Sequence, residues 1–383
     1  MQCIAWTGQL LRQLGAVLGA VLVGLAAQAQ PIVVAQIGPF TGLPSPDAKE
    51  INEGARAVFQ QVNRAGGVRG RSIELFELDD QFTADGFARQ LQAALPRKPV
   101  ALISPIGSGA LGKLVNEKLL DRHAIAVINA IPGSEPFRKP GHPLLFHVRA
   151  SDRQQLEKIV QHARTLGVSR LGVLYQDLPI GTAGLKVVQE LAAQAGQTPL
   201  SVNGTLAKPD ADALTAAATQ ALAAQPQAVV VIGAPKFMAD AVAALRKAGA
   251  RQFLFALSYM PAGLAYKLAG EDGARGVGIA QTFPNPNGVS LRLQRDFQSA
   301  MRALQPGAKA WTAFHLEGYV SARVLVEGLR QVNGEINADS LARALKGLGN
   351  LDIGGYVVNF SKSNEGSAFV DIGVIDSRGK LIY

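Results

Sequence analysis

The sequence is poor in the residues that build disulfide frameworks and thiol chemistry. It holds one cysteine, Cys3, among 383 residues, and Cys3 precedes the first apolar segment. A lone cysteine excludes an internal disulfide, and a chain that loses it by processing has no cysteine nucleophile. The five histidines lack the paired spacing of zinc ligands, and no serine stands in the G-x-S-x-G pattern of hydrolases. We therefore expect no catalytic residue and no metal site.

Long apolar runs are also missing, with one short exception near the N-terminus. Residues 14–27 are all aliphatic, alanine or glycine, but a helix of this length is too short to span a bilayer of about 30 Å. A single arginine precedes the run and Ala27-Gln28-Ala29 follows it, which is typical of a secretory signal peptide. We expect residues 1–29 to be removed and the mature protein to work in the periplasm.

Basic residues are not clustered, although the chain is basic overall. There are 38 Lys and Arg residues against 29 Asp and Glu residues, and no run of five basic residues occurs. A dispersed charge of this kind argues against a nucleic-acid partner. It favours a small anionic solute, because the field of the whole protein attracts anions.

Strand and helix patterns alternate along almost the whole chain, which predicts an α/β fold. Apolar strand patterns occur in two series, at 32–37, 73–78, 100–103 and 124–128, and then at 171–175, 228–232 and 253–256. Helical spacing separates them, including 181–195, 212–224 and 236–248, and Ser151 with Gln154 predicts a capping box. Two series predict two similar doubly wound parallel-sheet lobes, followed by a long helix over 311–329 and a hairpin of 356–360 with 369–375.

The order of the first parts resembles a known family. GPFTG at 38–42 follows the first strand, NRAGGVRGR at 63–71 follows the first helix, and Asp79-Asp80 ends the second strand. Together they resemble the leucine/isoleucine/valine-binding family of periplasmic solute receptors, which have the type I periplasmic binding protein fold. The resemblance covers essentially the whole mature chain. It implies a monomer without cofactor that delivers its solute to an ABC permease complex in the inner membrane.

The same resemblance implies how the chain divides into lobes. It would cross three times between them, near Arg149 and Ala150, near Ala280, and near Asp371. Lobe I would then contain residues 30–149 and 281–371, and lobe II residues 150–280 and 372–383. Three hinge crossings would allow the lobes to close around a ligand.

A glycine-rich turn is the main candidate for a binding element. Residues 107–112 read GSGALG between a predicted strand and a predicted helix, which fits the dinucleotide fingerprint and leaves a nucleotide-dependent enzyme as an alternative. That site needs an acid at the end of the next strand, where this chain has Asn129. Backbone N–H groups at a helix start bind a carboxylate equally well.

The resemblance assigns ligand contacts in the first lobe. Ser108, with the Gly109 N–H, would hold the ligand's carboxylate, and Ser134 with Gly133 would provide the second contact. Thr41 belongs to the loop after the first strand, which lines the cleft in that family.

The second lobe departs from the family pattern. The glutamate that meets a ligand's α-ammonium is missing from FALSY at 255–259, which leaves Ser258 and Tyr259 as contacts there. Lys236, at a helix start, would meet a second anionic group. A buried ammonium without a carboxylate is costly. We therefore expect a carboxylate-bearing solute without an α-ammonium group.

Two questions stay open at this point. Asp80 or Asp177, if either reaches the cleft, would restore amino-acid binding. An exported sensor domain of the same fold, reporting to a membrane receptor, is an alternative to a transport role.

Overall fold

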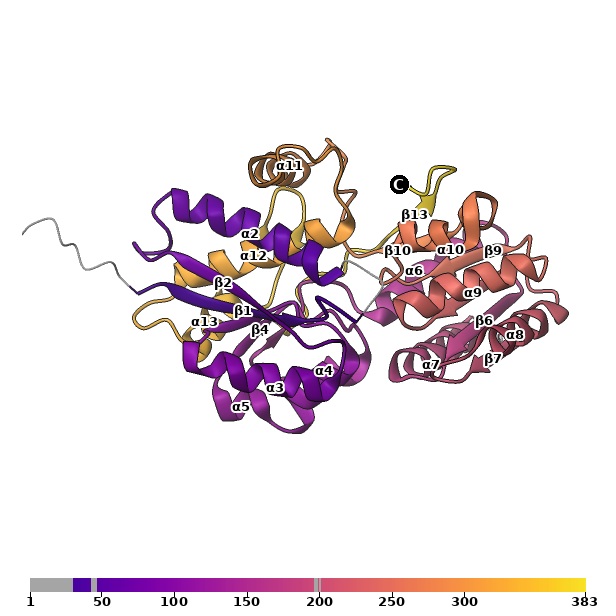
Figure 1. The fold of residues 1–383 in the computed structure, drawn as a ribbon, viewed down its shortest axis with the longest axis horizontal. Helices are drawn as coiled ribbons and strands as arrows, with labels where there is room; N and C mark the ends of the chain where they lie inside the picture. The colour runs from indigo at the N-terminus through magenta and orange to yellow at the C-terminus, as the bar shows by residue number, and fades with distance from the viewer. Residues whose placement is uncertain (1–29, 43–46, 196–198, 200) are drawn as a thin grey trace, which may run out of the picture.

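The computed structural model describes residues 30–42, 47–195, 199 and 201–383. Two sheets, each covered by helices on both faces, lie side by side in the long direction of the molecule (Figure 1). The predicted signal peptide and the loop at 43–46 lie outside the described residues.

The first sheet is fully parallel and has the order β2-β1-β3-β4-β5. Its strands are β1 (Ile32–Gly38), β2 (Ile73–Asp79), β3 (Ala101–Ile103), β4 (Ala126–Ile128) and β5 (Leu145–Phe146). Successive residues of β1 enter different cores, because side chains alternate across a strand. Val34 packs on one face of the sheet, and Ala35 and Ile37 pack on the other. Both faces are therefore buried, as a parallel sheet requires.

Helices cover both faces of this sheet. One face carries α2 (Asp47–Arg64), α11 (Arg292–Leu304), α12 (Ala313–Gln331) and α13 (Ala338–Gly347), and the other carries α3 (Ala84–Ala94), η1 (Leu95–Arg97), α4 (Ser108–Asn116) and α5 (Leu119–His123). The helices α2 and α12 touch through glycine. A Cβ on Gly54 would lie 2.0 Å from the His315 carbonyl oxygen, and one on Gly318 would lie 2.0 Å from that of Ile51. Glycine at both positions lets the two backbones meet.

The second sheet contains seven strands in the order β14-β13-β10-β9-β8-β6-β7. Its strands are β6 (Leu171–Gln176), β7 (Ser201–Thr205), β8 (Ala228–Ile232), β9 (Phe253–Ala256), β10 (Gly278–Gln281), β13 (Asp371–Ile375) and β14 (Leu381–Ile382). Strands β6, β7, β8, β9 and β10 are parallel to one another, and β13 and β14 add an antiparallel edge beside β10. The chain end thus completes this sheet.

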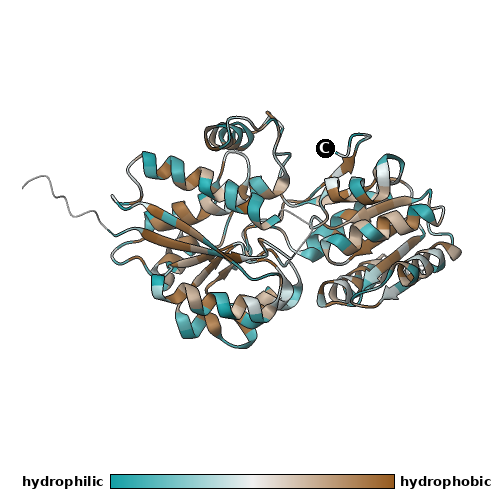
Figure 2. Cartoon of the chain, in the orientation of Figure 1, coloured by the Kyte–Doolittle hydropathy of each residue, from teal (hydrophilic) through white to brown (hydrophobic). Residues whose placement is uncertain are grey.

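In the described part of the chain, five helices cover the second sheet. They are α6 (Asp152–Thr165) and α7 (Pro179–Gln194) on one face, and α8 (Ala211–Ala223), α9 (Pro235–Lys247) and α10 (Ala262–Ala274) on the other. The predicted capping box is confirmed at α6, where the Ser151 hydroxyl accepts the Gln154 N–H and the Gln154 amide oxygen accepts the Ser151 N–H. Figure 2 shows apolar strands inside both lobes and polar residues along the outer helix faces.

The predicted fold class is confirmed, because both lobes are α/β with mainly parallel sheets. The predicted hairpin is wrong. The short strand β12 (Val357–Val358) pairs with β11 (Leu351–Asp352), whereas β13 pairs with β10 and β14 in the other lobe. The strands β7 and β10 were not predicted from the apolar pattern, nor were α10, α11 and α13.

Three chain segments join the lobes. The first runs from β5 to α6 and contains Arg149 and Ala150, both fully buried. The other two follow β10 and precede β13. Within those strands, Ala280 pairs with Ile372, and Gln281 pairs with Asp371. Residues 281 and 371 thus belong to strands of the second sheet. The lobe boundaries predicted at these residues therefore fall within that sheet and not between the lobes.

Candidate functional site

A cavity of about 310 Å³ lies between the lobes, at the carboxyl ends of the parallel strands. The first lobe contributes Asp47 and residues 80, 82–84, 106–110 and 131–132. The second lobe contributes residues 178–180, 234–235 and Tyr259. Asp47 begins α2, after β1, and the other segments follow β2, β3 and β4 in one sheet and β6, β8 and β9 in the other.

The topology of each sheet explains this position. In the first sheet β1 lies between β2 and β3, and in the second β6 lies between β7 and β8. The connections that follow β1 and β3, and those that follow β6 and β8, leave toward opposite faces of their sheets. This opens a crevice beyond the carboxyl ends of the strands. The two crevices face each other across the crossings, so a ligand held there would touch both lobes.

Most of the cavity wall is apolar. Its large side chains include Phe82 and Ile106 from the first lobe, with Leu178 and Ile180 from the second. No lysine, arginine or histidine belongs to this wall among the described residues. The wall therefore suits a compact apolar body, and any anion must be held by neutral donors.

Neutral donors are present at the start of α4. Gly107, with φ of 98°, precedes the helix, and a Cβ there would lie 3.1 Å from the Phe82 ring. Ser108 is the first helical residue, and its hydroxyl has no hydrogen-bond partner in the described part of the chain. The first N–H groups of a helix lack internal partners and carry a partial positive charge. Ser108 and the Gly109 N–H thus offer donors to an anion in the cavity.

The acid pair after β2 divides into two environments. Asp79 accepts the Thr41 N–H at 3.1 Å and the Gln81 N–H at 3.0 Å. Burial acts to raise the pKa of Asp79, but these hydrogen bonds and that of the Thr41 hydroxyl lower it overall. Asp80 is 1% exposed and lines the cavity. Burial raises the pKa of Asp80 to about 6.

Tyr259 connects the lobes at the cavity wall. Its phenol donates to Asp152 at 2.5 Å and accepts the N–H of Gly133, in the first lobe, at 2.9 Å. Burial, and then the Asp152 carboxylate, raise the pKa of Tyr259, so the phenol stays protonated. Tyr259 therefore lines the cavity and also makes an inter-lobe hydrogen bond.

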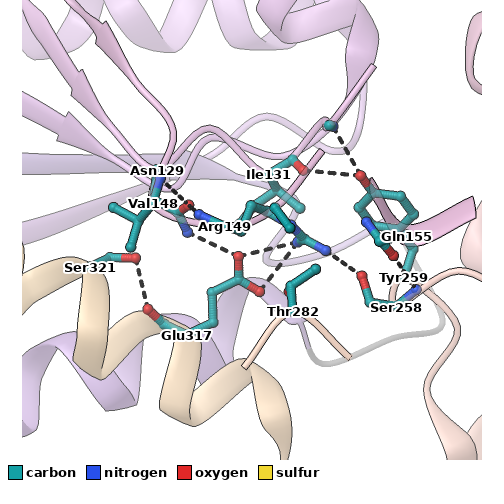
Figure 3. Close-up of polar contacts among 12 residues, drawn as sticks. Asn129, Ile131, Val148, Arg149, Gln155, Ser258, Tyr259, Thr282, Glu317 and Ser321 are labelled. Atoms are coloured by element: carbon teal, nitrogen blue, oxygen red, sulfur yellow. Dashed lines mark hydrogen bonds and ion pairs between the residues drawn. The ribbon is translucent and has the colours of Figure 1, made fainter. Parts of the chain in front are cut away.

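A buried ionic network fixes the first crossing (Figure 3). The Arg149 guanidinium contacts both carboxylate oxygens of Glu317, on α12, at 3.1 and 3.3 Å. It also donates to the Ser258 hydroxyl and lies over the Tyr259 ring, 4.7 Å from its centroid. Burial alone would lower the pKa of Arg149, but Glu317 reverses this and raises it. The first crossing is therefore tied to both lobes.

Asn129 supports the same network from the end of β4. Its amide donates to Glu317 at 2.9 Å, and its oxygen accepts the N–H groups of Val148 and Arg149. Asn129, the residue that stands where a dinucleotide site needs an acid, is thus part of the crossing (Figure 3).

The structure brings only part of the predicted ligand set to the cavity. Ser108, Gly109 and Tyr259 line it. Gly133 and Ser134 lie beside it, where Gly133 bonds Tyr259 and Ser134 is buried. Ser258 accepts from Arg149 at the crossing, and Thr41 bonds Asp79.

Lys236, which the sequence analysis predicts as a ligand contact, does not line the cavity. Its ammonium pairs with Asp240 at 2.5 Å on α9. It lines a separate groove of about 980 Å³ on the outer face of the second lobe, among α8, α9 and α10. The cause is local, because a lysine at the first turn reaches an acid four residues later on the same helix.

The sequence analysis does not predict several residues of the cavity wall as ligand contacts. Phe82, Leu178 and Ile180 follow strand ends directly, so their position after a predicted strand was the available signal. The described residues contain no group of three or more His, Cys, Asp or Glu arranged to hold a metal. Within them, no helix has the length and hydropathy needed to cross a membrane.

Comparison with known proteins identifies the family. A family model described as periplasmic binding protein matches residues 31–380. The structure is similar to an extracellular ligand-binding receptor from Verminephrobacter eiseniae, at 49% identity and a TM-score of 0.87, over 92% of this chain and 100% of that one. No curated protein matches the chain.

Two more distant structures share the fold. A branched-chain amino acid transporter substrate binding protein from Streptococcus pneumoniae, in complex with isoleucine, is 18% identical, with a TM-score of 0.79 over 92% of this chain and 97% of that one. A fatty acid ABC transporter substrate-binding protein from Thermomonospora curvata is 18% identical, with a TM-score of 0.81 over 92% and 91%.

These matches confirm the resemblance seen in the sequence and the type I periplasmic binding protein fold. The protein binds a solute and is not an enzyme, which also answers the nucleotide-dependent alternative. With a family model spanning nearly all described residues and a cavity at the matching crevice, the chain belongs to the periplasmic binding protein family.

Proposed function

We propose that this protein captures a small carboxylate-bearing solute between its lobes and delivers it to an ABC permease complex. The observation that carries this is the start of α4 in the cavity wall. Among the described residues, the Ser108 hydroxyl and the first N–H groups of α4 have no hydrogen-bond partner, and the wall that they adjoin has no basic side chain. Such a helix start holds an anion without a cation, and the apolar wall receives the rest of the solute.

Similar proteins support the carboxylate and the transport role. The Streptococcus pneumoniae structure contains isoleucine, and the Thermomonospora curvata protein is described as a fatty acid carrier. Both kinds of solute bear a carboxylate on an apolar body, and both proteins are described as parts of transporters. Only the first kind bears an α-ammonium.

We propose further that the solute has no α-ammonium group. The second-lobe wall offers Leu178, Ile180 and Tyr259 but no acid. Asp177 is exposed and does not line the cavity. Asp47 and Asp80 do line it, in the first lobe, so the proposal requires that neither of them pairs with an ammonium group of the solute.

The site of action follows from the family and the N-terminus. Periplasmic capture requires export, and the predicted signal peptide at 1–29 provides for it. A monomer with one cleft is the expected working form.

A thermal-shift panel tests the ligand class. Amino acids, aromatic acids, and aliphatic mono- and dicarboxylates would each be added to the mature protein. A solute at 100 times its Kd stabilises the folded state by about 2.7 kcal/mol, which is readily measured. We expect ammonium-free acids to give the largest shifts. A micromolar Kd for leucine, isoleucine or valine would overturn the ammonium-free proposal, and a panel without any binding acid would overturn the carboxylate proposal.

A further inference from the structure

One acid of the cavity wall has an oxygen to which no described residue donates a hydrogen bond. The Asp80 Oδ1 accepts the Phe82 N–H at 2.8 Å. Its Oδ2 is buried and has no hydrogen-bond partner in the described part of the chain. A buried polar atom without a partner costs free energy. Since Asp80 lines the cavity, the missing partner is one that a solute can supply.

The surroundings of Asp80 contain few positive charges. The titratable groups of the cavity wall besides Asp80 are Asp47, in the first turn of α2, and Tyr259, which is bonded to Asp152. The neighbouring elements add Asp79 on β2 and the Asp85–Lys113 pair, which joins α3 and α4 at 3.2 Å. Lys113 also pairs with Glu117 at 2.8 Å, so its charge is engaged away from the cavity. A solute carboxylate would therefore enter a wall that already carries carboxyl groups.

We propose that Asp80 is protonated in the complex and donates a hydrogen bond from Oδ2 to the bound acid, so that capture takes up one proton. This inference rests on the proposed function, because it requires an anionic solute without its own cation. The proton comes from the solvent and stays on the Asp80 carboxyl group until the solute leaves. Asp80 would thereby select ammonium-free acids over amino acids.

Physical chemistry favours the protonated form. In the ligand-free protein, burial raises the pKa of Asp80 to about 6, and the charge of Asp79 adds to the effect, although the Phe82 N–H opposes it. A neighbouring solute carboxylate and the loss of water on closure both disfavour a second negative charge. The same Oδ2 that lacks a partner as an acceptor becomes a donor once it is protonated.

The experiment compares two matched solutes. 4-Methylpentanoate is leucine without its ammonium group, and both fit the size of the cavity. Isothermal titration calorimetry would measure both Kd values for the wild type, Asp80→Asn and Asp177→Asn from pH 6.5 to 8.5. Repeating the titrations in buffers with different ionisation enthalpies gives the number of protons taken up.

We expect wild-type affinity for 4-methylpentanoate to fall on the order of tenfold per pH unit, with one proton taken up. Asp80→Asn carries an N–H donor at the same place, so its affinity should be independent of pH. The exposed control Asp177→Asn should keep the wild-type slope. Affinity without a pH slope, or leucine bound more tightly than 4-methylpentanoate and lost in Asp80→Asn, would overturn the proposal.

A ligand-free measurement completes the test. Carbon-13 NMR of the aspartate carboxyl groups, assigned by the signal missing from Asp80→Asn, follows the ionisation of Asp80 directly. A pKa near 6 is expected without solute, and an ordinary value near 4 would overturn the inference. Binding of acids with no pH slope would reject only the proton step, whereas a panel in which no acid binds would reject the proposed function itself.

Discussion

The position of Ser108 allows its contribution to solute binding to be measured separately from its contribution to stability. The structure places Gly107, and not Ser108, at the cap of α4, and the Ser108 hydroxyl makes no capping bond. Ser108→Ala should therefore leave the free energy of unfolding almost unchanged in the absence of solute. It should weaken binding of an ammonium-free acid by about 1.5–3 kcal/mol, the range for hydrogen bonds to charged groups. Calorimetry and chemical denaturation measure the two quantities.

A matched control strengthens this test. Ser290 is an exposed serine outside the cavity wall, and Ser290→Ala should change neither quantity. Equal affinities of Ser108→Ala and the wild type would remove Ser108 from the binding site.

Asp80 should make stability depend on pH. Its pKa rises from 3.8 to about 6 on folding, so with rising pH the unfolded chain loses this proton first. The free energy of unfolding should then fall between about pH 4 and 6, by up to about 3 kcal/mol. Asp80→Asn removes this penalty, and denaturation at pH 7 should show a more stable protein. A variant less stable than the wild type at pH 7 would show that the carboxylate has a stabilising partner.

The sequence predicts some residues of the cavity wall and not others, for physical reasons. Ser108, Asp80 and Tyr259 each stand close behind the carboxyl end of a parallel strand, where the fold class alone directs them to the crevice. The predicted contact Lys236 also follows a strand, but its long side chain turns outward to Asp240. Side-chain direction depends on packing and local ion pairs, which a strand pattern does not contain.

At the scale of elements, α12 holds the first crossing through Glu317. Removing one partner of a buried ion pair leaves the other charge uncompensated, at a cost of about 3–5 kcal/mol. Glu317→Gln should lower the free energy of unfolding by this amount, because Arg149 is fully buried. The same helix offers a control, since Glu327 pairs with Arg330, whose side chain is 46% exposed. Glu327→Gln should cost at most about 0.5 kcal/mol, and equal losses would contradict the role given to Glu317.

Strand prediction depends on the apolar pattern of a segment and not on whether the strand is central, because the edge strand β2 is predicted and the buried central strand β10, which reads GIAQ, is not. Residues 228–232 and 253–256 were predicted with the observed bounds, because both are continuous apolar runs. The edge strand β7 reads SVNGT, which has no apolar run. The predicted hairpin failed because two strands close in sequence belong to different lobes. Periodicity reports what faces a core, but it does not report which core.

At the scale of the molecule, the cavity between the lobes predicts closure. A solute that contacts both walls stabilises the closed form by its higher affinity for that form. Small-angle scattering should therefore give a smaller radius of gyration at saturating concentrations of the acid with the largest thermal shift. An unchanged scattering curve, with the acid shown to be bound by calorimetry, would reject closure and leave the fold untouched.

The interleaved course of the chain also has a consequence for how the protein is made. The first lobe begins at β1 but needs α12, from residue 313 onward, to cover one face of its sheet. The second lobe obtains its antiparallel edge only from β13 and β14, after residue 370. A growing chain therefore completes neither lobe until its last segment has been synthesised.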